Sequence, residues 1–312
     1  MAGSAITIGT RGSQLALWQA NWAKAAIEGA FPGQKVVLTV IKTQGDKILD
    51  VPLAKVGGKG LFVKEIEEAL LDRRIDLAVH SMKDMPADIP EGLCIGAVPR
   101  REAPWDVLIA RESLPLEQLK KGARIGTSSL RRAAQLLHVR PDIAIVPLRG
   151  NLDTRLKKLQ TESLDAIVLA QAGVRRLGLV DRITQVLEPS VMLPAVGQGA
   201  LCIEIRQDDP RIQPVAAALD HLPTRRVVLG ERAFLNRLEG GCQVPIAGHG
   251  HIDDRGYALT GMVCEVDGSR QIKHSLSGAL TQSEAVGLEL AETLLAMGAG
   301  EILERLNADA HE

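Results

Sequence analysis

"ARIGTSSLRRAAQLL", residues 123–137, carries the pattern on which the predicted fold rests. A short apolar run ends in a Gly-Thr-Ser-Ser loop, and an amphipathic pattern that contains two arginines follows at once. These features predict a buried strand and then a helix whose start is marked by serine. "TIGTRGSQLAL", residues 7–17, shares the Ile-Gly-Thr and a serine near a helix start. Unless this short match is a coincidence, it indicates two lobes of similar build.

The alternation of strand, polar loop and helix recurs through the first two-thirds of the chain. It predicts parallel sheets with helices on their faces. In the first predicted helix, Leu15, Trp18 and Trp22 share one apolar face. The predicted strands are 5–10, 35–43 and 75–80, the helix before the last of these is 61–74, and the same pattern returns over 143–159 and 165–179.

Breaks in this pattern divide the chain. One lies near 98–107, and another lies near 188–205, where Pro and Gly precede one more apolar strand that returns to the first lobe. After 219–226 the pattern changes to short strands and a long helix. We therefore predict an α/β fold of two lobes with mainly parallel sheets, followed by a smaller α+β domain. The predicted division is 1–99 with 200–218 for the first lobe, 100–199 for the second and 219–312 for the C-terminal domain, with strands 244–251, 256–265 and 270–276 and a helix over 282–297.

Composition narrows the function classes. The chain has 312 residues, is 46% hydrophobic and carries a formal net charge of −1, so no global basic field favours nucleic acid. Aromatic residues make up 2%, which argues against recognition by base stacking. No signal peptide and no membrane-spanning apolar run is predicted. Four cysteines without a C-x-x-C indicate a reduced, cytoplasmic protein without a zinc site or other metal.

One of the four cysteines stands apart from the others. Cys94, Cys202 and Cys264 lie in apolar runs, which predicts small buried side chains in strands. Cys242 lies in "LEGGCQVP", residues 238–245, on a glycine loop that suits an exposed thiol.

Polar residues gather where the predicted strands end. In open α/β sheets ligands bind at these ends, where helix N-termini favour anions. Guanidinium groups add bidentate recognition of carboxylate or phosphate. Taken singly, each arginine is equally well a solvated surface charge; together they predict a polyanion-binding cleft. The polar residues are Arg11, Ser13, Ser81, Lys83, Asp84, Thr127, Ser128, Ser129, Arg131, Arg132, Arg149, Arg155 and Arg176.

Three further features allow more than one interpretation. The glycine-rich "AKVGGKGLFVKE", residues 54–65, lacks the spacing of a nucleotide-binding P-loop, and it is either a lid whose Lys55 and Lys59 reach the cleft or an ordinary surface loop. Asp84 is either a turn former or a carboxylate that accepts two N–H groups and delivers a proton. His80 is either a residue that orients its neighbours or a structural one.

Seven segments together resemble the porphobilinogen deaminase (hydroxymethylbilane synthase) family. They occur in the order found in that family between residues 7 and 246, and the likeness is weakest after about residue 250. The segments are "TRGSQLALWQA", "PLAKVGGKGLFVKE", "DLAVHSMKDMP", "IGTSSLRR", "LRGNLDTRL", "LPAVGQGAL" and "RLEGGCQVPI".

The resemblance implies a transferase of haem (porphyrin) biosynthesis with two lobes like those of periplasmic binding proteins. Its Cys242 carries a dipyrromethane cofactor through a thioether, which explains an exposed thiol on a loop. Four porphobilinogen units are added to this primer in turn, each with loss of ammonia through an azafulvene, and water then releases the linear tetrapyrrole hydroxymethylbilane. Asp84 is implied as the catalytic acid. The resemblance also implies a monomer.

Further roles follow from the matched motifs. The implied cofactor-binding residues are Cys242, Lys83, Asp84, Thr127, Ser128, Ser129, Arg131 and Arg132. The implied substrate-binding residues are Arg11, Ser13, Ser81, Arg149, Arg155, Arg176, Gln198, Lys55, Lys59 and Phe62. The carboxylates of the fully elongated chain outnumber these cations, so either the chain shifts past a fixed Asp84 or the domains move to admit it.

Two rival functions come from other classes. A non-catalytic cytosolic binding protein for small anions uses the same two-lobed architecture, but it has no need of the Cys242 thiol. A phosphate-transferring enzyme needs a P-loop or a cluster of metal-binding carboxylates, and the sequence shows neither.

Overall fold

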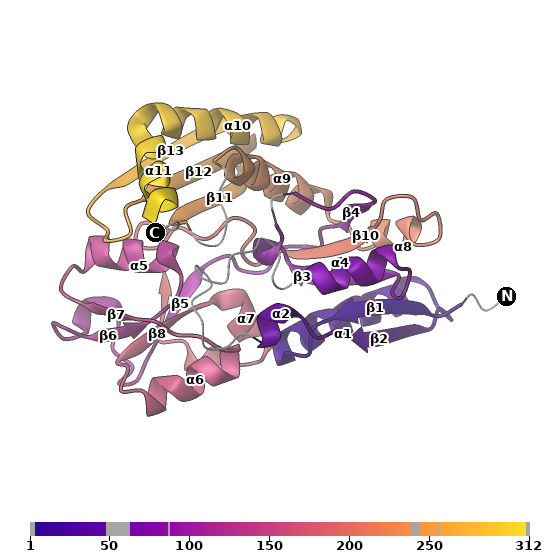
Figure 1. Cartoon of the computed structure of the whole chain (residues 1–312), viewed down its shortest axis with the longest axis horizontal. Helices are drawn as coiled ribbons and strands as arrows, with labels where there is room; N and C mark the ends of the chain where they lie inside the picture. Colours follow the sequence, from indigo (N-terminus) through magenta and orange to yellow (C-terminus); the bar gives the residue numbers. More distant parts are fainter. Residues whose placement is uncertain (1–3, 48–62, 87, 239–243, 255, 310–312) are drawn as a thin grey trace. The chain divides into compact units, whose positions relative to one another are not determined.

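The computed structural model describes residues 4–47, 63–86, 88–238, 244–254 and 256–309. The chain forms two compact units (Figure 1). The first comprises Met1–Val51, Gly58–Glu102 and Ala200–Arg225, and the second comprises Pro52–Gly57, Ala103–Gly199 and Arg226–Glu312. The three-part division expected from the sequence stays a prediction.

The first unit is built on a five-stranded sheet of order β2-β1-β3-β10-β4. β1 is parallel to β2 and β3, whereas β10 is antiparallel to β3 and β4. The strand near residue 200 therefore pairs with strands of this unit. The strands are β1 (Ile6–Thr10), β2 (Val36–Val40), β3 (Leu77–Ser81), β4 (Leu93–Ala97) and β10 (Leu201–Arg206), and the helices are α1 (Gln14–Ala30), α2 (Gln44–Lys47), α4 (Lys64–Leu71), η1 (Met82–Asp84) and α8 (Gln213–Ala217).

The second unit contains a sheet with the same arrangement. Its order is β7-β6-β8-β5-β9, with β6 parallel to β7 and β8 and with β5 antiparallel to β8 and β9. The strands are β5 (Asp106–Ala110), β6 (Arg124–Gly126), β7 (Ala144–Val146), β8 (Ala166–Ala170) and β9 (Gln185–Leu187), and the helices are η2 (Leu116–Gln118), α5 (Leu130–Val139), α6 (Leu152–Thr161), α7 (Gln171–Arg176) and η3 (Val180–Arg182).

The α/β class is confirmed, and four of the five strands in each five-stranded sheet run in the same direction, as predicted, while the fifth makes each sheet mixed. In each sheet the fourth strand in spatial order, β10 or β5, runs against both neighbours. Neither strand is joined to a parallel neighbour by a crossover helix, so the strand–helix–strand rule does not apply to it. The two quoted stretches that share Ile-Gly-Thr occupy equivalent places, as β1–α1 and β6–α5.

The C-terminal part of the second unit is α+β, as predicted. An antiparallel sheet of order β11-β12-β13 packs one face against helices, and Figure 1 shows α10 along this sheet. Phe234, Leu259 and Leu290 lie in that core, and the aromatic ring of Tyr257 is fully buried there. The elements are α9 (Leu222–Arg237), β11 (Ile246–Asp253), β12 (Gly256–Cys264), β13 (Gln271–Gly278), η4 (Leu280–Gln282), α10 (Ser283–Leu294), the π-helical turn η5 (Leu295–Ala299) and α11 (Gly300–Asp309).

Helix α1 packs against the first sheet mainly with small residues, together with Ile27. Ala16, Ala20 and Ala23 are buried on its inner face, whereas Trp18 is 37% exposed. The apolar face formed by Leu15, Trp18 and Trp22 is therefore not the buried one. Alanines let the helix backbone approach the strands closely, and the larger residues cover the edge of the contact.

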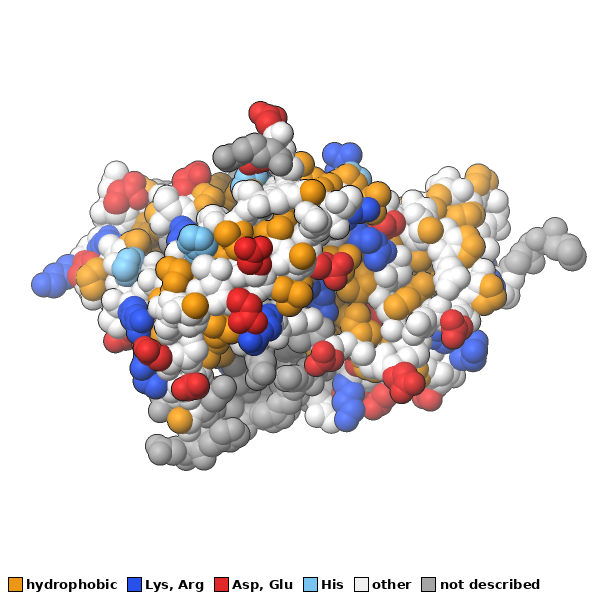
Figure 2. Space-filling view, turned by 90° about the horizontal axis from the view of Figure 1, so that it is seen from above, with side chains coloured by type: hydrophobic (Ala, Val, Ile, Leu, Met, Phe, Trp, Pro, Cys, Tyr) orange, Lys and Arg blue, Asp and Glu red, His pale blue; other side chains and the backbone are white. Residues whose placement is uncertain are grey.

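The three described cysteines lie in strands, as predicted. Cys94 is half-buried in β4, and Cys202 and Cys264 are buried in β10 and β12. Figure 2 shows acidic and basic side chains mixed over one face of the molecule, in keeping with a net charge of −1. Within the described residues, every helix is too short or too polar to cross a bilayer.

Candidate active site

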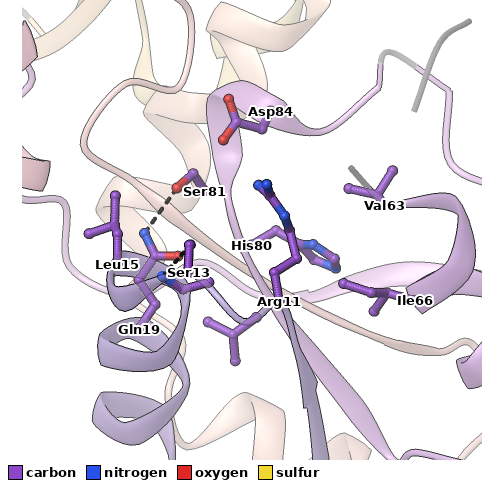
Figure 3. A pocket seen from close by; sticks show the side chains of 11 residues that line it. Arg11, Ser13, Leu15, Gln19, Val63, Ile66, His80, Ser81 and Asp84 are labelled. Carbon is purple, nitrogen blue, oxygen red and sulfur yellow. Dashed lines mark hydrogen bonds between the residues drawn. The ribbon is translucent and has the colours of Figure 1, made fainter. Parts of the chain in front are cut away.

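A pocket opens at the carboxyl ends of β1 and β3 in the first unit (Figure 3). Parallel neighbours bring these two strand ends together, so residues far apart in sequence meet there. Four predicted site residues, Arg11, Ser13, Ser81 and Asp84, are among those that line it. The remaining lining residues are Leu15, Ala16, Gln19, Val63, Ile66, Val79 and His80.

The polar wall of the pocket is held by hydrogen bonds. Ser13 begins α1 as its N-cap, and its side-chain oxygen accepts from the backbone N–H of Ala16 at 3.3 Å. Gln19, one turn further on, is buried and donates from Nε2 to Oγ of Ser81 at 2.9 Å. The dashed line in Figure 3 marks this bond, which fixes the end of β3 against α1.

Asp84 lies at the end of the short helix η1 that follows β3, and its side chain is exposed. Figure 3 shows the guanidinium of Arg11 directed toward the part of the pocket where Asp84 lies. Lys83, on the same short helix, is half-buried. The arrangement presents a carboxylate and a guanidinium to one hollow, which suits a ligand that has both a donor N–H group and an acid group.

Two buried acids that sequence reasoning did not single out lie close to His80, which lines the pocket. Nε2 of His80 lies 3.0 Å from Oε2 of Glu204, with side chains 4% and 0% exposed. Glu67 of α4 is buried as well. Its burial and, after that, the charge of Glu204 raise the pKa of Glu67 to about 7, while His80 acts in the opposite direction. A carboxyl group that ionises near neutrality therefore lies next to the pocket.

The β6–α5 loop of the second unit holds its predicted residues in an ordered turn. Oγ1 of Thr127 accepts from the N–H of Ser129 at 3.2 Å, and Ser129 is the N-cap of α5. The hydroxyl of Ser128 donates to the carbonyl of Leu148 at 3.0 Å and accepts from its N–H at 2.9 Å. These bonds join the carboxyl ends of β6 and β7, as the parallel pairing of the strands requires.

Arg131 and Arg132 are buried rather than open to solvent. Nη1 of Arg131 is 2.8 Å from Oδ2 of Asp106, and Nη2 of Arg132 is 2.7 Å from Oδ1 of the same carboxylate. Each guanidinium also donates to a backbone carbonyl, that of Leu193 at 2.7 Å or that of Val168 at 3.0 Å. Burial lowers the pKa of Arg131, and Asp106 offsets part of that shift. Two cations face one anion here, which leaves positive charge for a further acid group.

The remaining predicted residues of the second unit are anchored to the backbone. Nε of Arg155 donates to the carbonyl of Gly150 at 2.8 Å, and Nη2 of Arg176 donates to that of Gly199 at 2.7 Å. Gln198 is buried and donates from Nε2 to the carbonyl of Pro104 at 2.7 Å. Arg149 is half-buried directly after Leu148.

The structure therefore places the predicted residues in two groups. Arg11, Ser13, Ser81 and Asp84 meet in the pocket of the first unit. In the second unit the threonine and the serines follow β6 and Arg149 follows β7, whereas the remaining arginines lie in helices α5, α6 and α7. Their roles stay predictions. Cys242, Lys55, Lys59 and Phe62 lie outside the described residues. In the described part of the chain, no group of three or more His, Cys, Asp or Glu side chains is arranged to hold a metal ion.

Sequence reasoning missed Gln19, Asp106, Glu204 and Glu67. Asp106 and Glu204 carried a signal that was available: each is an acid inside an apolar strand, in "WDVLIA" and "ALCIEI". A charged residue in a strand that is buried on both faces needs a partner, so such a position marks a polar cluster. Glu67 carried no comparable signal, since "KEIEEALL" contains three glutamates of which only one faces the core.

Two family models match the chain. The model for "Porphobilinogen deaminase, dipyromethane cofactor binding domain" matches residues 6–214, and the model for "Porphobilinogen deaminase, C-terminal domain" matches residues 226–296.

The chain belongs to the porphobilinogen deaminase family.

Relatives agree over nearly the whole length. The porphobilinogen deaminase of Syntrophotalea carbinolica is 56% identical over 98% of this chain and 98% of its own. That of Geobacter metallireducens is 55% identical over 97% of this chain and 95% of its own. Among solved structures, the chain is similar to the methionine binding protein MetQ, with 14% identity and a TM-score of 0.45 over 69% of this chain and 89% of that one.

Proposed function

We propose that this chain is a transferase of haem biosynthesis that joins four porphobilinogen units head to tail, with loss of ammonia, and releases hydroxymethylbilane. The observation that carries the proposal is the match to both porphobilinogen deaminase family models, over residues 6–214 and 226–296. The pocket supports it, because Asp84 and Arg11 offer a proton donor and an anion partner in one hollow.

Asp84 acts on the incoming porphobilinogen. Its carboxylate accepts pyrrole N–H groups, and in its acid form it protonates the departing amine, so that ammonia leaves and an azafulvene forms on the substrate. The ionised carboxylate then faces the positive charge that develops on that ring. Arg11, together with Ser13 and Ser81, holds the acid side chains of the substrate with charge-assisted hydrogen bonds, each of which contributes roughly 1.5–3 kcal/mol.

The donor groups of the second unit suit an anionic dipyrromethane cofactor. Arg131 and Arg132 share the single carboxylate of Asp106, so an excess of positive charge is available to the cofactor's acid groups. Thr127, Ser128 and Ser129 supply hydroxyl donors and Cys242 supplies the thioether. Lys83 of the first unit is the proposed ammonium donor. When bound, the cofactor offers the free pyrrole carbon to which the first substrate unit is added. Arg149, Arg155, Arg176 and Gln198, with Lys55, Lys59 and Phe62, are the proposed contacts of the growing chain.

The finer organisation belongs to the same proposal. In this proposal 1–99 with 200–218 and 100–199 are two lobes that bind the substrate, and 219–312 carries the cofactor. The protein works as a monomer in the cytoplasm, where free thiols such as Cys94 and Cys202 stay reduced. Sedimentation analysis of the purified protein tests the monomer: a mass near 33.5 kDa is expected, and a stable dimer contradicts it.

Intact-protein mass spectrometry tests the cofactor. The purified chain should carry an adduct of two linked pyrroles, and the adduct should be lost in Cys242→Ser but kept in Cys202→Ser. Formation of hydroxymethylbilane by a chain that carries nothing on Cys242 would contradict the proposal, and so would an unmodified chain that only binds small anions.

Ammonia release from porphobilinogen tests Asp84. Asp84→Ala should lower the rate by roughly 100-fold or more, the range expected when a positioned acid is lost. Asp88→Ala is the matched control, since Asp88 is another exposed acid close by in sequence. Equal rates in the wild type and in Asp84→Ala would exclude Asp84 as the acid.

A further inference from the structure

Glu67, Glu204 and His80 lie on one face of the first sheet, the face covered by α4. Side chains alternate along a strand, so His80 shares its face with Ala78, and Ala78 packs in the core formed with Ile66 of α4. On β10, Ile203 and Ile205 belong to the core on the opposite face, which places Glu204 on the α4 side. Two acids and one imidazole are thus enclosed between a helix and a sheet.

Each of the two enclosed acids has one carboxyl oxygen without a hydrogen-bond partner among the described residues. Within the described residues, Oε1 of Glu67 and Oε1 of Glu204 are buried and have no hydrogen-bond partner. The exposed fraction is 7% for Glu67 and 0% for Glu204. An unpaired buried oxygen is rare in folded proteins and is usually explained by strain, by bound water or by chemistry. A carboxyl group that gains a proton removes the charge and supplies a donor for its neighbour, so the arrangement favours protonation of one acid.

The charges around Glu67 come from every element packed against it. Glu68 lies on its own helix, His80 on β3, and Glu204 and Arg206 on β10. Arg206 is directed to the far end of α4, where its Nη1 donates to the carbonyls of Leu70 and Ile75. Burial, Glu204 and Glu68 raise the pKa of Glu67, and His80 lowers it. Glu67 is therefore a group whose proton is exchangeable under physiological conditions and is coupled to His80.

The cluster reaches the pocket through His80. This residue, along with Val63 and Ile66 at the start of α4, lines the same hollow as Arg11 and Asp84 (Figure 3). Glu204 holds one ring nitrogen of His80, and the ring is the part of the cluster that borders the pocket. A path for a proton thus runs from the pocket to His80 and on to the buried carboxylates.

We propose that Glu67, Glu204 and His80 form a proton-holding site next to the pocket, with His80 as the group that exchanges the proton with the bound pyrroles. The inference rests on the proposed function. When two pyrrole rings join, the new carbon–carbon bond forms, the carbon–hydrogen bond at the joining carbon breaks and its electron pair restores the aromatic ring. The proton passes to His80 and the cluster and returns from there to the carboxylate of Asp84, while the ammonia leaves as the neutral molecule. Asp84 is then free to serve the next amine.

The first test measures the carboxyl group of Glu67 in the cofactor-loaded protein by isotope-edited infrared spectroscopy over a pH series. The infrared band of the Glu67 carboxyl group is identified as the band that is lost in Glu67→Gln. In the wild type the carboxyl should titrate near pH 7. Glu204→Gln should move the midpoint down, since it removes a like charge, and His80→Asn should move it up. Glu68→Gln, which alters an exposed acid on the same helix, should move it much less. A midpoint in the ordinary range for glutamate, or shifts of the opposite sign, would overturn the proposal.

The second test separates the cluster from the proposed function. His80→Asn should lower kcat roughly 100-fold and leave KM close to that of the wild type, as expected when a proton-transfer group is lost. In the wild type, kcat should change with pH near pH 7 as Glu67 gains or loses its proton. Glu67→Gln, a substitution of nearly equal shape, should remove this pH dependence while the protein stays folded. A rise in KM alone, or a wild-type pH profile in both variants, would contradict the proposal. If the wild type itself makes no linear tetrapyrrole, the proposed function fails, and the infrared midpoints still decide whether the cluster holds a proton.

Discussion

The two units enclose buried charges in opposite ways. In the second unit, Asp106 is bound by Arg131 and Arg132, and both guanidiniums also bind backbone carbonyls. In the first unit, Glu204 binds the imidazole of His80, Glu67 lies near both, and one oxygen of each acid has no partner among the described residues. The first kind of cluster keeps its charges, because a guanidinium stays protonated and both guanidiniums bind the same carboxylate. The second kind can change its proton content, because no fixed countercharge balances both acids.

The largest effect is expected from breaking the guanidinium cluster. Asp106→Ala leaves two cations buried without their carboxylate, which should destabilise the protein by about 3–5 kcal/mol. Urea unfolding measures the change, with Asp72→Ala as the control. Asp72 pairs with Arg74 at the surface, with side chains 63% and 56% exposed, so its loss should leave the midpoint nearly unchanged. Equal effects of the two substitutions would remove the contrast between buried and exposed pairs.

A smaller, pH-dependent effect is expected from Glu67. Its pKa is raised to about 7 in the folded protein from an ordinary value of 4.5, so the folded state takes up the proton at higher pH than the unfolded chain does. The free energy of unfolding should therefore fall as pH rises between those two values. Glu67→Gln should gain stability relative to the wild type by about 2–3 kcal/mol between pH 5 and pH 8, because the shift from 4.5 to about 7 is worth about 1.4 kcal/mol for each pKa unit.

The control for that prediction is the pH dependence itself. Near pH 5 the wild type still holds most of its proton on Glu67. The stability of Glu67→Gln relative to the wild type should therefore be lower near pH 5 than near pH 8. If the difference in the free energy of unfolding between Glu67→Gln and the wild type stays the same from about pH 5 to pH 8, Glu67 is not protonated in the folded state.

The smallest effect concerns the thiol beside the guanidinium cluster. Burial raises the pKa of Cys264 to about 12, and the nearby charge of Arg131 lowers it only in part. The native thiol should resist alkylation by iodoacetamide, because the reactive form is the thiolate. Asp106→Asn unbalances Arg131 and should speed the alkylation of Cys264 a few-fold, while Cys202 in the first unit keeps its wild-type rate. Peptide mass spectrometry follows both sites, and an unchanged rate at Cys264 would show that Asp106 does not balance Arg131.

Much of the local fold could be predicted from the sequence. The strand–loop–helix stretches at 7–17 and 123–137 correspond to β1–α1 and β6–α5, and Ser13 and Ser129 cap the helices as their positions indicate. Strand direction could not be predicted for β5 and β10, because periodicity reports which residues are buried but not which way a strand runs. The buried face of α1 was not evident either, since its alanines carry less apolar character than its tryptophans yet pack closer.

The candidate site was predictable in part for similar reasons. Arg11, Ser13, Ser81 and Asp84 meet because strand ends meet in an open sheet, and this rule needs only the sequence. The buried acids that pair with the buried arginines and with His80 could not be predicted from the sequence of the loops. Asp106 and Glu204 reach Arg131, Arg132 and His80 from strands that are distant in sequence, and those strands enter the sheets through the two crossings between the units.

The position of β10 has a consequence for synthesis on the ribosome. This strand lies between β3 and β4, yet it is translated only after the whole of the second five-stranded sheet. A nascent chain that has reached β9 can already pair every strand of the second sheet, whereas β3 still has an open edge and β4 has no neighbour. The N-terminal half must therefore wait, with an exposed strand edge that invites wrong pairing and chaperone binding, until residues 201–206 emerge.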